Sequence, residues 1–121
     1  MLCPFCVPED EVFGNGLAYA KMDTYPVSKG HMLIIPRRHA DTWFDLTAEE
    51  QTAVMQLAEI AKRYLDEFYS PNGYNLGLNC GVSAGQTIMH AHLHLIPRYI
   101  GDVPNPRGGI RAVIAAKKEY P

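Results

Sequence analysis

The chain has 121 residues, of which 47% are hydrophobic and 20% are charged, and its formal net charge is −2. This length is enough for one domain with a buried core and too short for two comfortable ones. The balanced composition argues against a disordered chain and against a broad nucleic-acid-binding surface, and no apolar run or leader indicates a membrane segment or export. We therefore expect a cytoplasmic protein with no nucleic-acid or membrane partner.

The charges are unevenly distributed along the chain. Residues 1–97 carry six Lys/Arg against eleven Asp/Glu, whereas residues 98–121 carry five against two. The three glycines and two prolines of residues 101–109 predict an irregular segment. Residues 100–121 are therefore predicted to form an irregular basic arm, which either helps to hold an anion or is simply a solvated end.

The first motif is Cys3-Pro4-Phe5-Cys6. Three cysteines are too few for a disulfide framework, so this spacing indicates half of a zinc site or a redox dithiol. A thioredoxin-like dithiol would follow a strand of a βαβ unit, and this one begins at the third residue. The pattern favours a zinc-binding segment over residues 1–10, if two further ligands exist. Cys80 stands alone and is predicted to be a small buried residue.

Periodicity and turn residues predict five strands and one helix. The helix is expected over residues 47–69, because Thr47 and Glu50 form a capping box and apolar residues recur at helical spacing. That apolar stripe consists of Val54, Leu57, Ala58, Ala61, Leu65 and Phe68. The strands are expected at residues 12–13, 17–20, 31–36, 74–79 and 90–96. Short turns and a single helix between these strands predict an α+β domain with a mostly antiparallel sheet, covered on one face by the helix.

The last strand carries three of the five histidines, His90, His92 and His94, at alternating positions. Alternation places their imidazoles on one face of the strand, and Pro97 is expected to close it. The outer two would be rooted about 13 Å apart, so one metal ion is not expected to bind all three.

Three interpretations of this strand compete. Its histidines face solvent or a polar core, or two of them bind zinc in a hydrolase completed by His31 or Asp23, or one of them is a nucleophile. A histidine that attacks phosphorus needs donors for the phosphate oxygens. The glycine-containing segment of residues 81–87 has backbone N–H groups, the Gln86 amide and the Thr87 hydroxyl to supply them.

The sequence from Gln86-Thr87 through His90-Ala91-His92-Leu93-His94-Leu95-Ile96 resembles the defining pattern of the histidine triad family, His-x-His-x-His-x-x with apolar x positions. Asp23, Gly30-His31 and the run to Pro36-Arg37-Arg38-His39 resemble the N-terminal half of that family. The resemblance covers about residues 3–99. It implies a single domain over residues 1–121, with a five-stranded antiparallel sheet, a usual homodimer and nucleotidyl hydrolase or transferase activity through a nucleotidyl-histidine.

Roles follow from the resemblance residue by residue. His92 would attack the α-phosphorus, His94 would stabilise the phosphate oxygens, and His31 would support the triad from the adjoining strand. Asp23 would bind the ribose hydroxyls. The residues expected to contact the phosphate and the leaving group are Asn79, Gly85, Gln86 and Thr87. Similar members carry Cys-x-x-Cys with two distant histidines, so the implied structural zinc ligands are Cys3, Cys6, His39 and His90.

The substrate class is less sharply defined. Residues 97–102, Pro-Arg-Tyr-Ile-Gly-Asp, resemble the Pro-Arg-x-x-Gly-Asp run of the dinucleoside polyphosphate branch, in which Arg98, Arg107 and Arg111 would meet the extra phosphates. Phe13, Leu17 and Met22 are candidates for a base pocket. We expect a diadenosine tetra- or triphosphate type of substrate. The alternatives are a nucleoside phosphoramidate of the AMP-lysine type, and a zinc-stabilised nucleotide-binding or interaction protein with vestigial activity.

Overall fold

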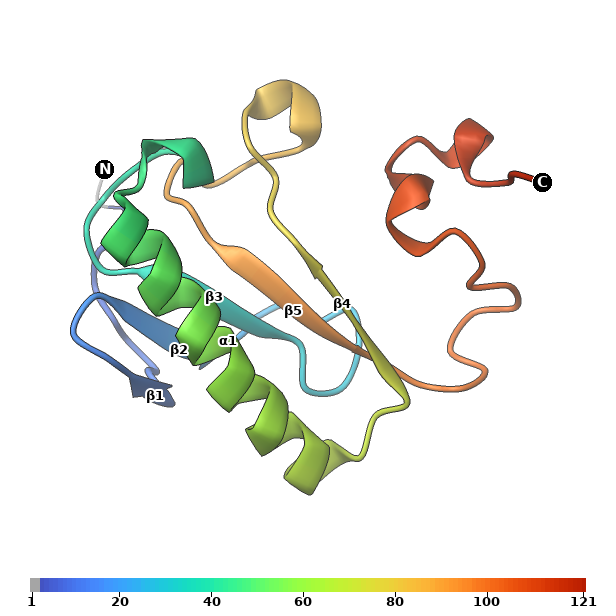
Figure 1. The fold of residues 1–121 in the computed structure, drawn as a ribbon, viewed down its shortest axis with the longest axis horizontal. Coiled ribbons are helices and arrows are strands. Elements are labelled where there is room, and N and C mark those ends of the chain that lie inside the picture. Colours follow the sequence, from blue (N-terminus) through green and yellow to red (C-terminus); the bar gives the residue numbers. More distant parts are fainter. Residues whose placement is uncertain (1–2) are drawn as a thin grey trace.

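A computed structural model describes residues 3–121. Its five strands are β1 (Phe13–Gly14), β2 (Ala18–Met22), β3 (Met32–Pro36), β4 (Gly73–Gly77) and β5 (Leu93–Arg98). They form one antiparallel sheet in the order β1-β2-β3-β5-β4, and the long helix α1 (Ala48–Tyr69) crosses one face of it (Figure 1). The α+β architecture predicted from the sequence is confirmed.

Four short 3-10 helices lie in the connections. They are η1 (Trp43–Asp45), η2 (Val82–Ala84), η3 (Gly109–Val113) and η4 (Ala115–Lys117). The last two belong to the C-terminal arm, residues 100–121, which stands beside the β4 edge of the sheet (Figure 1). None of the helices formed by residues 3–121 has the length and apolar character needed to cross a membrane.

Helix α1 begins where its capping box predicts. The Thr47 hydroxyl accepts a hydrogen bond from the Glu50 N–H, and the Glu50 carboxylate accepts one from the Thr47 N–H. The helix buries Val54, Leu57 and Leu65 against the sheet, and each such side chain stabilises the fold by about 1.5–3 kcal/mol. Phe68, predicted in the same apolar stripe, is instead 65% exposed and packs only on Tyr64 among the aromatic rings, because the last turn of α1 extends beyond the sheet (Figure 1).

The sheet has two covered faces. Alternating residues of β3 point to opposite sides, so Met32 and Ile34 pack toward α1 while Leu33 and Ile35 pack with Tyr19 and Phe5. All five residues of β3 are therefore buried. His94 is paired with Leu33 of β3 and Gly77 of β4, which places its side chain on the face opposite α1. That face carries the functional side chains described below.

The histidine strand differs from its predicted bounds at both ends. It starts at Leu93, because the preceding segment leaves the ladder and the Ala91 N–H donates to the Ala40 carbonyl. It also continues through Pro97, which was expected to close it. Pro97 is tolerated because its carbonyl faces the loop before β3, where it accepts a hydrogen bond from the Ser28 hydroxyl, beyond the end of the β3–β5 ladder.

Candidate functional site

Four side chains from three distant segments meet at one end of the sheet. Cys3 Sγ lies 3.3 Å from His90 Nδ1, Cys6 Sγ lies 3.3 Å from His39 Nδ1, and Cys6 Sγ lies 3.6 Å from His90 Nδ1. The four ligand atoms all lie within 4.8 Å of one another. We call these residues the metal-ligating cluster. Tetrahedral zinc, with bonds of about 2.3 Å to sulfur and 2.0 Å to nitrogen, needs ligand atoms about 3.3–3.8 Å apart, so these donors fit that ion.

Hydrogen bonds fix which nitrogen of His90 faces the sulfur atoms. His90 is fully buried, and its Nε2 lies 2.7 Å from the Pro36 carbonyl. A carbonyl only accepts, so Nε2 carries the proton and the Nδ1 lone pair points at the thiols. Burial lowers the pKa of His90, which keeps the imidazole neutral as a metal ligand requires. Desolvation and the neighbouring Cys3 raise the pKa of the Cys6 thiol, so a bound cation is needed to hold both sulfur atoms as thiolates.

An ion pair fixes the loop that carries His39. The Arg38 guanidinium donates to both carboxylate oxygens of Glu50, at 2.9 and 2.8 Å, and also to the Asp45 carbonyl at 3.0 Å. Glu50 is 5% exposed, and these contacts hold the pKa of its carboxyl at about 2. The capping box of α1 thus also anchors one segment of the metal-ligating cluster.

The second group of histidines lies around the start of β5, with His92 just before this strand, His94 in it and His31 just before β3. His92 Nδ1 is 2.8 Å from the carbonyl oxygen of His90, so this nitrogen is the protonated one in the neutral ring. The Nε2 atom of His92 then keeps its lone pair. Neutral imidazole with an available lone pair is a competent nucleophile near pH 7.

His31 and His94 form a short hydrogen-bonded chain behind this nucleophile. The Val27 N–H donates to His31 Nδ1 at 3.1 Å, which leaves the His31 proton on Nε2. That Nε2 lies 2.9 Å from His94 Nδ1 and 3.3 Å from Asp23 Oδ2, so it donates to His94 and is shared with the carboxylate. The proton of neutral His94 is therefore on its Nε2, which makes that atom a donor for a phosphate oxygen.

The pKa values of these two rings support the neutral assignment. Burial lowers the pKa of His31, although the Asp23 carboxylate opposes this shift. Burial lowers the pKa of His94 to about 4, and the neighbouring His92 and His31 rings act in the same direction. Both rings are consequently neutral at pH 7, and the chain from His31 to His94 acts through hydrogen bonds rather than through a fixed positive charge.

These histidines face a cavity of about 300 Å³ on the sheet face opposite α1. We call it the reaction cavity. Of the residues predicted from the sequence, it brings together His31, His92, His94, Asp23, Asn79, Gly85 and Thr87. The remaining wall is formed by Phe5, Tyr25, Val27, Leu33 and Ile88.

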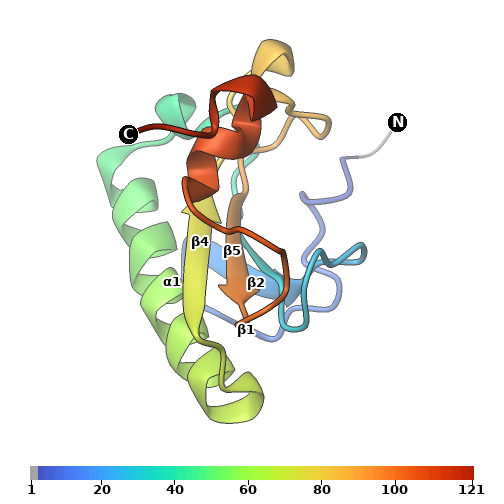
Figure 2. The same cartoon turned by 90° about the vertical axis from the view of Figure 1, so that its right-hand side faces the viewer.

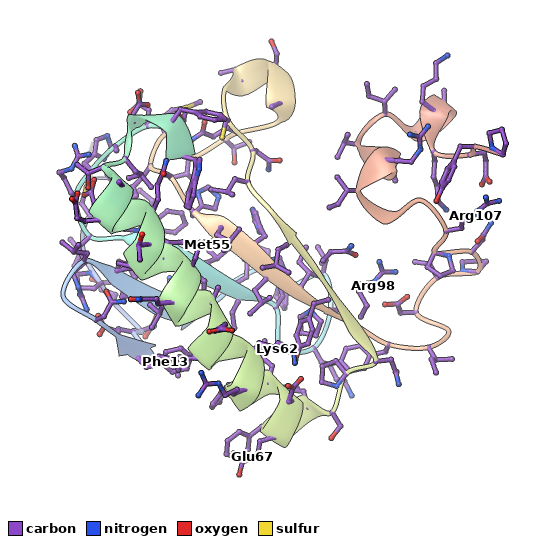
Figure 3. All side chains as sticks on the ribbon, viewed as in Figure 1. Phe13, Met55, Lys62, Glu67, Arg98 and Arg107 are labelled. Carbon is purple, nitrogen blue, oxygen red and sulfur yellow. The ribbon has the colours of Figure 1, made fainter. Side chains whose placement is uncertain are left out.

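Two predicted substrate contacts are engaged elsewhere. Gln86 is 3% exposed, and its amide accepts from the Gly81 N–H and donates to the Asp41 and Ile88 carbonyls, so both ends of its side chain hold the loop together. Arg98 lies between the sheet and the C-terminal arm (Figure 3), where it forms a bidentate pair with Asp102 at 2.8 and 2.9 Å. The structure does not bring the side chain of either residue into the reaction cavity.

The base-pocket candidates also lie elsewhere, and sequence reasoning missed Phe5. Phe13 and Met22 pack in the core beneath α1, and Leu17 faces a different hollow. Phe5 stands between the two cysteines, and its ring contacts His92 edge-on at a centroid distance of 5.0 Å. The signal was present in the Cys-x-x-Cys spacing, because any residue between two ligands of the cluster is held close to His90.

Comparisons with known proteins agree with this geometry. A model of the family described as "HIT domain" matches residues 6–101. The chain is 38% identical over 87 residues to "AP-4-A phosphorylase" of Mycobacterium tuberculosis, a match that covers 71% of this chain and 45% of that protein. It is 33% identical over 103 residues to "Bis(5'-adenosyl)-triphosphatase" of Dictyostelium discoideum, which covers 84% of this chain and 69% of that protein.

A solved structure shares the fold as a whole. The chain is similar to a Zn-bound histidine triad family protein from Mycobacterium smegmatis, with a TM-score of 0.75 and 28% sequence identity, and the match covers 94% of this chain and 91% of that chain. The chain spans less than half of the mycobacterial phosphorylase, so the name of that longer protein does not by itself establish the activity of this chain.

Proposed function

The chain belongs to the HIT domain family, and from that premise we propose that it cleaves a dinucleoside polyphosphate of the diadenosine tetra- or triphosphate type at its α-phosphate. The names of the phosphorylase and triphosphatase relatives support this substrate class. The observation that carries the proposal is the free Nε2 lone pair of His92, which results from the hydrogen bond between its Nδ1 and the His90 carbonyl.

The first step is attack by His92 on phosphorus. The Nε2 lone pair forms a bond to the α-phosphorus, and the bridging P–O bond breaks. Its electron pair leaves with the other product, a nucleoside polyphosphate. His94 Nε2–H and the Thr87 hydroxyl donate to the equatorial phosphate oxygens, which carry the charge of the transition state. Asp23, with one oxygen engaged by the Tyr25 N–H, lies where it can accept from ribose hydroxyls.

The second step regenerates the histidine. A water oxygen attacks the phosphorus of the nucleotidyl-histidine, the N–P bond breaks with its electron pair returning to Nε2, and the proton of the water passes to solvent. The product is then a nucleoside monophosphate. If inorganic phosphate attacks instead, the product is a nucleoside diphosphate, so the acceptor decides between a hydrolase and a phosphorylase.

We also propose that the metal-ligating cluster holds zinc in a structural role. Four protein donors close a tetrahedral site and leave no position for substrate. When bound, zinc supplies the positive charge that holds the two thiolates together. Cys3, Cys6 and His39 thereby fix His90, whose carbonyl orients the His92 ring. A cytoplasmic homodimer is part of the same proposal.

Trapping of the intermediate tests the nucleophile. Brief incubation with diadenosine tetraphosphate labelled in the adenosine should leave an acid-labile, base-stable label on His92. In His92→Ala the label should be absent and the rate should fall by about 10⁴-fold or more, because a group that forms the covalent bond cannot be replaced by water. Equal rates in wild type and His92→Ala would refute the assignment, and loss of chemistry by a chelator in protein that stays folded would favour a metal hydrolase.

A panel of substrates separates the remaining alternatives. Faster release of AMP from an adenosine phosphoramidate than from diadenosine tetra- or triphosphate would replace our choice with the AMP-lysine type of substrate. Nucleotide binding without turnover of any panel member would indicate an interaction protein with vestigial activity.

A further inference from the structure

A second cavity, of about 290 Å³, adjoins the reaction cavity. It lies between strands β4 and β5 and the C-terminal arm, which passes in front of both strands in Figure 2. Its volume is close to the lower bound of about 300 Å³ for small-molecule sites. The two cavities share four residues, Val27, His31, Asn79 and His94. They are therefore neighbours on either side of the His31–His94 pair.

The position of His92 distinguishes the two cavities. His92 lines the reaction cavity and does not line the second one, whereas His94 lines both. In phosphoryl transfer the attacking atom and the leaving oxygen lie roughly in line on opposite sides of phosphorus. With His92 as the nucleophile and His94 on the phosphate, a leaving group that departs away from His92 would meet the cavity that His94 lines and His92 does not.

The lining of this cavity indicates the chemistry of its ligand. Most of its walls are apolar, and amide groups of Asn75 and Asn79 lie among them. The apolar side chains on this face are Val27, Ile96, Ile110 and Val113, whereas Leu76 in β4 and Leu78 just after it line the cavity from positions where alternation turns their side chains toward α1. Polyphosphate alone has no affinity for such walls, whereas a flat heterocycle with hydrogen-bonding edges suits apolar walls with a few polar groups. We propose that this leaving-group cavity binds the base of the leaving nucleotide, an inference that rests on the function proposed above.

The C-terminal arm carries two of these side chains, Ile110 and Val113. The guanidinium carbons of Arg107 and Arg111 lie 4.6 and 4.8 Å from the centroid of the Tyr120 ring. Arg111 also donates to the Lys117 and Lys118 carbonyls, so the arm is folded on itself. The arm approaches β4 at Gly77, where an added Cβ would lie only 3.9 Å from the Ile110 side chain.

Without a ligand in this cavity, Ile110 and Val113 expose apolar surface to water. They remain 56% and 80% exposed although they line a cavity beside the catalytic histidines. A bound heterocycle would remove apolar surface of both from water, which gives the arm a direct energetic link to substrate binding.

A matched pair of substrates and a matched pair of variants test this inference. Diadenosine tetraphosphate and adenosine 5′-tetraphosphate offer the same α-phosphate and the same number of phosphates, and they differ in the second adenosine, which is replaced by an ionisable oxygen on the terminal phosphate. Ile110→Asn, which adds no charge, separates loss of the base contact from repulsion of that phosphate. Ile110→Asp places a carboxylate in the leaving-group cavity, and Ile114→Asp places one on the same arm at a residue that does not line it. Both positions are more than half exposed, so both variants should fold, as circular dichroism and thermal melting would verify.

The expected result is a loss specific to one substrate. In Ile110→Asp, kcat/KM for AMP release from diadenosine tetraphosphate should fall by about 10-fold or more, which corresponds to about 1.4 kcal/mol, while that for adenosine 5′-tetraphosphate changes by less than about twofold. Val113→Asp should behave in the same way, and Ile114→Asp should alter neither value.

Two outcomes would overturn the inference for different reasons. If wild type turns over both substrates and Ile110→Asp and Val113→Asp affect both equally or not at all, the arm does not bind the leaving base, and the proposed hydrolysis stands. If wild type releases AMP from neither substrate, the proposed function fails and the inference fails with it.

Discussion

The two histidine clusters of this protein use opposite nitrogens for opposite purposes. In the metal-ligating cluster, His90 donates from Nε2 to the Pro36 carbonyl and leaves Nδ1 free to face the thiols. In the reaction cavity, His92 donates from Nδ1 to the His90 carbonyl and leaves Nε2 free. In each case a backbone carbonyl selects the tautomer, so the segment that leads into β5 turns a lone pair of one imidazole toward the thiols and leaves a lone pair of the next one free.

Burial also separates His90 from His92 and His94. His90 is inaccessible to solvent, whereas His92 and His94 are partly exposed and line a cavity. A buried ligand stabilises the fold, and an accessible imidazole can meet a substrate. The comparison therefore predicts that damage to the first cluster is felt mainly as lost stability and damage to the second as lost turnover.

The largest effect on stability is expected from removing a thiolate of the metal-ligating cluster. Cys3→Ser should lower bound zinc from about one per chain to near zero, and the free energy of unfolding should fall by several kcal/mol, because metal binding free energy is folding free energy. Cys80→Ser is the control, since Cys80 is a partly buried free cysteine outside the cluster. Elemental analysis and denaturant unfolding would measure both. Full zinc and full stability in Cys3→Ser would show that the cluster is not a metal site.

A smaller loss should follow from breaking the ion pair that anchors the His39 loop. Glu50→Gln leaves the Arg38 guanidinium without its carboxylate and should cost about 1–2 kcal/mol, because Glu50 is buried but the Arg38 side chain is 52% exposed and its charge is screened by solvent. The folded pKa of Glu50, about 2, lies below its unfolded value of about 4.3, so the contribution is present above pH 4.3 and lost as the pH falls toward 2.

The exposed Lys62–Asp66 pair on α1 provides the contrast. Asp66→Asn should cost much less than Glu50→Gln, because solvent screens an i,i+4 surface pair. Urea unfolding at pH 7 and at pH 3 would measure both variants. Equal losses at the two sites would mean that the buried geometry of Glu50 contributes nothing.

A pH-dependent effect concerns protonation of the reaction cavity. The pKa of His94, about 4, lies below the unfolded value of about 6.5, so the folded state resists protonation that the unfolded state accepts. Stability should therefore be constant above pH 6.5 and decline by about 1–2 kcal/mol as the pH falls from 6.5 to 4, allowing for the partial exposure of the ring. In His94→Asn this part of the pH dependence should disappear. An unchanged profile in the variant would assign the effect to another group.

Local patterns in the sequence were enough to predict the fold class and most element bounds. The capping box of Thr47 and Glu50, the helical stripe and the alternation in the strands act over a few residues, and the structure reproduces them. The prediction failed at Pro97, because the cost of a proline in a strand depends on what lies beside it. That neighbour, Ser28, is 69 residues away.

The candidate site, like the fold, was predicted from the sequence in part. The spacing of His90, His92 and His94 already excluded one metal for all three, and the family resemblance gave the four residues that the structure gathers into the metal-ligating cluster. The same resemblance placed Gln86 and Arg98 at the substrate. Their side chains are instead engaged by the loop and by Asp102, through contacts that depend on how the loops fold around them.

The sequence by itself determined which residue types carry the candidate chemistry and the order of the elements around them, because strand alternation and helix capping are local, but His90 and His92 lie ahead of β5 rather than in it. The tertiary structure decided which nitrogen of His90 is free, because the carbonyl and the thiols around that ring are brought in by the fold, whereas the tautomer of His92 is set locally by the His90 carbonyl two residues away. Cys3 meets His90 across 87 residues, and the carbonyl that orients His90 belongs to Pro36, 54 residues away. Those long-range contacts set the orientation of His90, and the His90 carbonyl in turn orients the His92 ring.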